Sequence, residues 1–97
     1  MNFSALKQEL ESLFISLQES LQYGEIPSED NLNKFVRLAR QMLSNAEDNW
    51  AGECEDFVHL SVQLQQACKK GLIEDATLLI ESLDDARSFC HRTFRDI

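Results

Sequence analysis

Apolar residues recur every three or four positions along most of this sequence, and that spacing constrains the fold more than any other feature. A helix of about 3.6 residues per turn brings such residues onto one side, where they form an apolar stripe that another element must cover. The first stripe, with Phe14 beside it, consists of Phe3, Leu6, Leu10, Leu13, Leu17 and Leu21. The chain of 97 residues has only three Gly and one Pro, so few residues interrupt such helices.

Turn and capping residues divide the pattern into four helical segments. Gly24 is a natural C-terminal cap for the first segment, and Pro27 stops it. Ser28 or Asp30 is placed to cap the second segment. Gly71, which follows two lysines, marks the end of the third segment and the start of a fourth that runs to about residue 94.

The boundary between the second and third segments allows two interpretations. Ser44 and Glu47 in the sequence SNAE have the spacing of a capping box, which predicts that a third helix opens there. Because the connections are short, neighbouring helices should be antiparallel, which gives an all-α, up-and-down four-helix bundle in one domain spanning residues 1–97. In the alternative, the second and third segments fuse through Asn45 and the fold is a three-helix bundle.

The later stripes predict the remainder of the core. The second stripe comprises Leu32, Phe35, Val36, Ala39, Met42, Leu43 and Ala46. The third comprises Trp50, Cys54, Phe57, Val58, Ser61, Leu64, Gln65 and Cys68. The fourth comprises Ile73, Ala76, Leu79, Ile80, Leu83, Ala86, Cys90 and Phe94.

The net charge of −8, from seventeen Asp and Glu against nine Lys and Arg, opposes two classes of partner. Nucleic acids and anionic membrane surfaces are bound mainly through Lys and Arg. The first residues, MNFSALKQELESLF, carry charge and are unlike a signal peptide, and no apolar run reaches the roughly 18 residues of a spanning helix. We therefore expect a cytoplasmic protein that binds neither nucleic acid nor membrane.

Three cysteines, Cys54, Cys68 and Cys90, are an odd number for a disulfide framework. Cys54 and Cys68 are fourteen positions apart. That is about 21 Å along a helix, too far to share a metal ion or a disulfide. We expect buried thiols that act as small apolar side chains, and neither a metal site nor a cofactor.

Cys90 and His91 match the second half of the Cys-x-x-Cys-His motif that attaches c-type haem. The first cysteine of that motif would stand at position 87, which is Arg87, so attachment through two thioethers is excluded.

Residues 71–95, GLIEDATLLIESLDDARSFCHRTFR, resemble the last helix of the soluble four-helix b-type cytochromes and of cytochrome c prime. The helix opens after a Gly and ends in His91, two residues, an aromatic residue and an Arg, and the likeness covers about a quarter of the chain. It implies non-covalent haem with His91 as an axial ligand. The b-type family also has a Met early in its first helix as the second ligand, whereas Met42 of this chain lies in the second segment. Haem binding through His91 is one alternative function.

His59 is expected on the exposed side of the third segment. An exposed His midway along a four-helix bundle is what histidine phosphotransfer domains use to accept a phosphoryl group. That family has Lys and Gly at the third and fourth positions after the His, where this chain has Val62 and Gln63. Glu55 and Asp56, one turn earlier, would repel a phosphoryl group. A solvated His is the leading interpretation, and phosphotransfer through His59 is the second alternative function.

No Gly-rich phosphate loop, nucleophile–base pair or pair of inward carboxylates is found in the sequence, so we expect no enzymatic activity. Apolar residues that miss the stripes are more informative: Ile15, Leu38, Leu60, Leu78 and Phe89. Leu78 and Phe89 share one side of the fourth segment, and Leu60 flanks the third stripe, which predicts a second apolar surface. The leading hypothesis is a non-enzymatic acidic protein that binds a protein partner, or a second copy of itself, through Leu60, Leu78 and Phe89.

Overall fold

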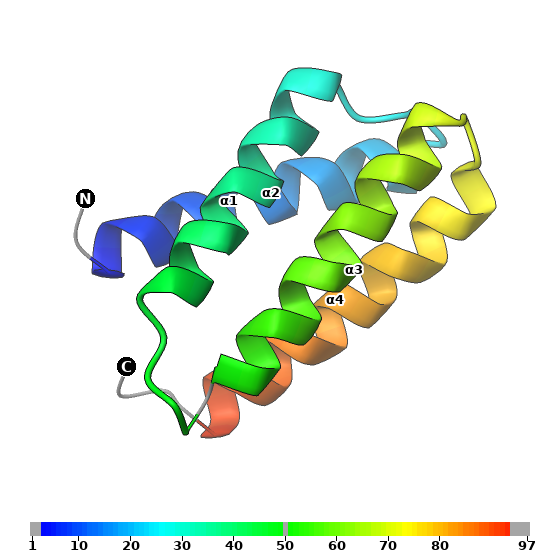
Figure 1. Ribbon diagram of the computed structural model, residues 1–97. Helices are drawn as coiled ribbons and strands as arrows, with labels where there is room; N and C mark the ends of the chain where they lie inside the picture. The colour runs from blue at the N-terminus through cyan, green and yellow to red at the C-terminus, as the bar shows by residue number, and fades with distance from the viewer. Residues whose placement is uncertain (1–2, 50, 94–97) are drawn as a thin grey trace.

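The computed structural model describes the backbone of residues 3–49 and 51–93 and the side chains of residues 5–49 and 51–87. These residues form helices α1 (Phe3–Gln22), α2 (Glu29–Ser44), α3 (Ala51–Lys69) and α4 (Ile73–Thr93), as Figure 1 shows. Each helix packs against the next in the chain, and α4 packs against α1, which closes the bundle. The predicted all-α four-helix bundle is confirmed. The three-helix alternative is wrong, because a loop separates α2 from α3.

Glycines end the first and third helices in the way the sequence predicts. Gly24 and Gly71 have φ angles of 73° and 72°, the left-handed conformation that side chains with a Cβ avoid. The Gly24 N–H donates to the Leu21 carbonyl at 3.0 Å, and the next N–H, that of Glu25, reaches back to the Ser20 carbonyl at 2.9 Å. This is a Schellman motif, and the same pair of bonds recurs around Gly71.

Two serines at the ends of α2 behave differently. Of the two predicted caps, Ser28 is the N-cap, and its hydroxyl accepts a hydrogen bond from the Asn31 N–H at 3.2 Å, whereas Asp30 lies within the first turn of α2. The capping box proposed at Ser44 is wrong: Ser44 is the last residue of α2, and its hydroxyl donates to the Arg40 carbonyl at 3.1 Å. A hydroxyl bonded back to its own helix cannot cap the next one. The third helix therefore begins only at Ala51.

Aromatic rings from three helices meet at the centre of the core. The ring of Phe35 in α2 lies 6.4 Å from that of Phe14 in α1 and 5.7 Å from that of Phe57 in α3, measured between centroids. Leu83 of α4 is completely buried in the same core cluster. Four predicted core positions, Phe3, Trp50, Cys90 and Phe94, lie outside the residues whose side chains the structure describes.

Leu38 corrects the sequence analysis. It was expected to miss the core, but only 2% of its surface is exposed and it belongs to the core cluster. Leu38 follows Lys34 by one helical turn, and Lys34 forms an ion pair with Glu9 of α1 at 2.8 Å. Leu38 is therefore on the side of α2 that faces α1. Because α2 packs between two helices, its buried arc is wider than a single stripe.

Candidate functional site

A shallow groove between α3 and α4 exposes two large aliphatic side chains. Leu78 is 62% exposed and Leu72 is 44% exposed, and both line a depression of about 380 Å³. The groove is completed by Gln63, Gln66, Ala67 and Lys70 from α3 and by Asp75 and Leu79 from α4. We call these residues the α3–α4 groove.

The local fold explains why these leucines reach the surface. The left-handed turn at Gly71 ends α3 and places Leu72 immediately before α4. Within α4, the buried face passes through Ala76, Ile80 and Leu83. Leu78 precedes Ile80 by two residues, which at 100° per residue places it about 160° around the helix from the buried face. Leu78 therefore points away from the core.

The three residues of the predicted apolar surface, Leu60, Leu78 and Phe89, differ in their exposure or in whether their side chains are described. Leu78 is exposed as expected, and it lines the groove. Leu60 is only partly exposed, and it packs against the core. Phe89 belongs to α4, but its side chain lies outside the described residues. Leu72 was not singled out by the sequence reasoning, although its position directly after Gly71, at a helix start, could have signalled exposure.

The structure describes the side chain of one of the two histidines, His59. His59 is exposed on α3, as predicted, and Glu55 and Asp56 one turn earlier are exposed as well. His91 lies in α4, but its side chain is outside the described residues. Among the side chains that are described, no three His, Cys, Asp or Glu residues gather in a way that could hold a metal ion.

The described cysteines are core residues. Cys54 and Cys68 are both buried, as predicted. Burial raises the pKa of the Cys68 thiol above its ordinary value, because a thiolate would lose hydration in the core. Cys68 is therefore suited to packing rather than to nucleophilic chemistry at neutral pH.

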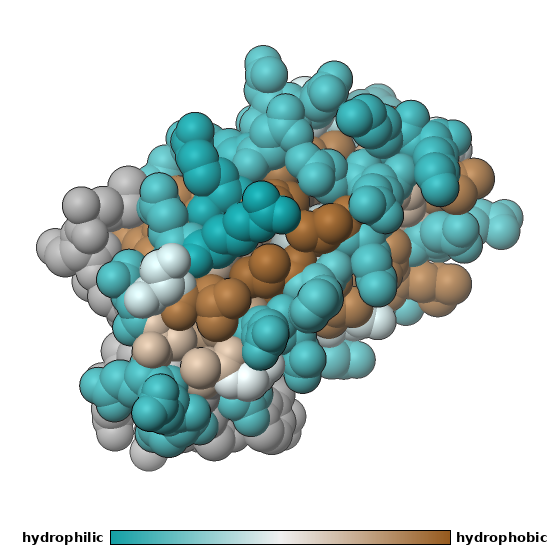
Figure 2. All heavy atoms as spheres, in the orientation of Figure 1, coloured by the Kyte–Doolittle hydropathy of each residue, from teal (hydrophilic) through white to brown (hydrophobic). Residues whose placement is uncertain are grey.

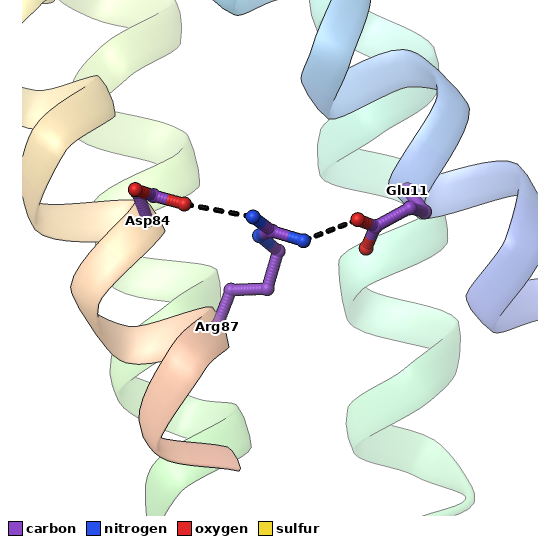
Figure 3. A network of polar contacts seen from close by, with 3 residues as sticks. All are labelled: Glu11, Asp84 and Arg87. Atoms are coloured by element: carbon purple, nitrogen blue, oxygen red, sulfur yellow. Dashed lines mark hydrogen bonds and ion pairs between the residues drawn. The ribbon is translucent and has the colours of Figure 1, made fainter. Parts of the chain in front are cut away.

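Sequence reasoning missed an ionic cluster that joins α4 to α1. The Arg87 guanidinium lies between the carboxylates of Asp84, at 2.9 Å, and of Glu11, as Figure 3 shows. It also lies over the Phe14 ring, 5.0 Å from the ring centroid. Burial alone would lower the Arg87 pKa, but the hydrogen bonds to Asp84 and Glu11 and their negative charges raise it above its ordinary value. Because both carboxylates are engaged, this cluster is a structural link.

A second shallow groove, of about 330 Å³, lies between α2 and α3. We call it the α2–α3 groove, and its lining residues are Asn33, Val36, Arg37, Arg40, Gln41, Ser44 and Gln65. In Figure 2, apolar side chains show as a broken band between α2 and α3, with strongly hydrophilic side chains along it. Neither Arg37 nor Arg40 was singled out by the sequence reasoning. The spacing of Arg37 and Arg40, which places them one turn apart, was the available signal.

Comparison of the chain with protein-family models, with curated proteins and with solved structures found no match. The surface chemistry of the chain itself is therefore what indicates a function. Within the described ranges, each helix falls short of the combined length and apolarity that crossing a bilayer requires.

Proposed function

We propose that this chain is a non-enzymatic, cytoplasmic helical module that works by binding another protein through the α3–α4 groove. The observation that carries the proposal is the exposure of Leu78 and Leu72 in one depression, at 62% and 44%. Single exposed leucines are common, but two large aliphatic side chains that line one groove offer a larger apolar contact than either does alone.

The rim of the groove suits a protein partner. Lys70 and Asp75 place opposite charges at its edge, and Gln63 and Gln66 add amide groups. An apolar centre with a polar rim is the usual composition of a protein interface. The occupant we propose is therefore an apolar side chain of a partner protein, held between Leu72 and Leu78.

The surroundings of His59 favour binding over phosphotransfer. Glu55 and Asp56 share its side of α3, and a phosphoryl group there would meet two negative charges. The Cys68 thiol, buried in the core, fits a reducing compartment such as the cytoplasm.

The test compares Leu78→Ser with a matched control. Ile15, on α1, is exposed to a similar degree, at 46%, and it lines neither groove. Both substitutions should change the free energy of unfolding by only about 0.5 kcal/mol, because both positions are exposed. Wild type, Leu78→Ser and Ile15→Ser are immobilised in parallel, and the proteins retained from cell extract are quantified by mass spectrometry.

We expect a partner that wild type and Ile15→Ser retain equally and that Leu78→Ser loses. Sedimentation equilibrium of the same three proteins detects the case in which the partner is a second copy. Phe89→Ser tests the remaining predicted surface residue in the same assays. Equal retention by all the variants, together with equal self-association, would contradict the proposal.

A further inference from the structure

We propose that the α2–α3 groove is a second binding site, and that its ligand is an acidic peptide segment of a protein partner. The groove combines Arg37 and Arg40 on one edge with the amide groups of Asn33 and Gln65. This inference goes beyond the proposed function, because α3 lies between the two grooves and either site can exist without the other (Figure 1).

The charges of Arg37 and Arg40 are available to a ligand. Elsewhere in the described chain, Lys34 is paired with Glu9, and Arg87 is held by Glu11 and Asp84. Arg37 and Arg40 are exposed, and no carboxylate among the described side chains lies within ion-pair distance of either. The same holds for Lys69 and Lys70, but Arg37 and Arg40 are the two basic residues that line the α2–α3 groove. The guanidinium groups of Arg37 and Arg40 are therefore available to an external carboxylate. A guanidinium group can bind a carboxylate through two parallel hydrogen bonds.

Two amide side chains join α2 to α3 beside the arginines, and Asn33 lies one turn before Arg37 on α2. The Gln65 side-chain N–H donates to the Asn33 side-chain oxygen, which fixes the two amides against each other across α2 and α3. The Asn33 N–H groups and the Gln65 carbonyl oxygen then remain as a donor and an acceptor next to each other. The backbone of an extended peptide carries a carbonyl oxygen, which can accept from the Asn33 side chain, and an N–H, which can donate to the Gln65 side chain.

The charge of the chain favours a short acidic peptide over larger anions at this groove. The net charge of −8 repels a nucleic acid duplex or an anionic membrane, each of which carries charge over a wide area. A short segment has to approach only the groove, and charges farther away than about 8 Å are screened at physiological ionic strength.

The probe for this site is a short fluorescein-labelled peptide in which Glu and Leu alternate, and binding is followed by fluorescence anisotropy. The comparison peptides replace every Glu by Gln or by Lys. We expect the Glu peptide to bind, the other two to bind much more weakly, and affinity to fall as salt is raised. In the Arg37→Gln/Arg40→Gln variant the affinity should fall roughly tenfold or more, as is typical when charged contacts of this kind are lost.

The matched control is Lys7→Gln/Lys69→Gln, which removes the same charge from positions that line neither groove. It should bind the Glu peptide as wild type does, and circular dichroism should show both double variants to be folded. Leu78→Ser should also bind normally, because Leu78 lines only the other groove.

Several results would overturn the inference. These are absence of binding, equal binding of the Gln peptide, and equal weakening by the two double variants, which would indicate unspecific charge attraction. Loss of binding in Leu78→Ser would place the peptide in the α3–α4 groove, which refutes this site and supports the proposed function. Self-association that disappears in Arg37→Gln/Arg40→Gln, without peptide binding, would assign the groove to a second copy of the chain and not to a partner.

Discussion

Replacement of Arg87 by methionine tests whether the link between α4 and α1 stabilises the bundle. The two ion pairs involve side chains that are 27–38% exposed, so each contributes only about 0.5–1 kcal/mol. The guanidinium over Phe14 adds about 1 kcal/mol as a cation–π contact. Methionine keeps much of the apolar stem, so the packing loss is small.

One feature of Arg87 acts in the opposite direction. Its Nε atom is buried and has no hydrogen-bond partner among the described groups, and an unsatisfied donor of this kind costs about 1 kcal/mol. Methionine removes that donor together with the favourable contacts. The free energy of unfolding should therefore fall by about 1–2 kcal/mol, which for a chain of this length corresponds to a decrease in Tm of roughly 4–16 °C.

The assay is urea denaturation followed by circular dichroism, with two comparison variants. Lys34→Met removes an ion pair to α1 whose lysine is 43% exposed and lies over no ring among the described side chains, and it should cost less than about 1 kcal/mol. Arg87→Lys keeps the charge but loses the fork that reaches both carboxylates, and it should fall between wild type and Arg87→Met. A loss in Arg87→Met no larger than in Lys34→Met would refute the reasoning, because the cluster would then be an ordinary surface pair.

The raised pKa of Arg87 also fixes the pH range of this effect. A group whose pKa is raised by folding contributes stability that is present below the unfolded pKa and lost as pH rises through the folded pKa. Both values lie at the alkaline extreme for this guanidinium, so Arg87 stays charged near neutrality. The difference between wild type and Arg87→Met should therefore not change between about pH 7 and pH 9 through titration of Arg87.

Three further predictions concern Leu38, His91 and His59. Leu38→Ala should lower the free energy of unfolding by about 2–5 kcal/mol, whereas Leu78→Ala should change it by about 0.5 kcal/mol; equal costs in urea denaturation would contradict the assignment of Leu38 to the core. The purified protein should be colourless and should not bind hemin tightly, and a Soret band that survives gel filtration and is lost in His91→Ala would revive the haem alternative. Incubation with phosphodonor kinases or receiver domains should leave the protein unlabelled, and acid-labile phosphate that is lost in His59→Gln would show that phosphotransfer had been misjudged.

The helices could be predicted from the sequence because their signals are local. A stripe such as Leu6, Leu10 and Leu17 depends only on spacing within one helix, and all three residues are buried. The left-handed turns at Gly24 and Gly71 depend only on residues within about one turn of the helix end. The SNAE sequence failed for a local reason as well, because the Ser44 hydroxyl can bond either to the helix before it or to the helix after it, and spacing does not decide between them.

Features that depend on which helices meet could not be predicted in this way. Leu38 misses the stripe of α2, yet it is buried because α1 covers the side of α2 that carries Lys34. Arg87 has a carboxylate one turn away in its own helix, which spacing could suggest, but its contacts with Glu11 and Phe14 join positions more than seventy residues apart. The same holds for the α2–α3 groove, where Gln65 meets Asn33 from the neighbouring helix. Periodicity identifies the face that a helix buries, whereas the side chains that link or line two helices depend on their relative register, which requires the three-dimensional structure.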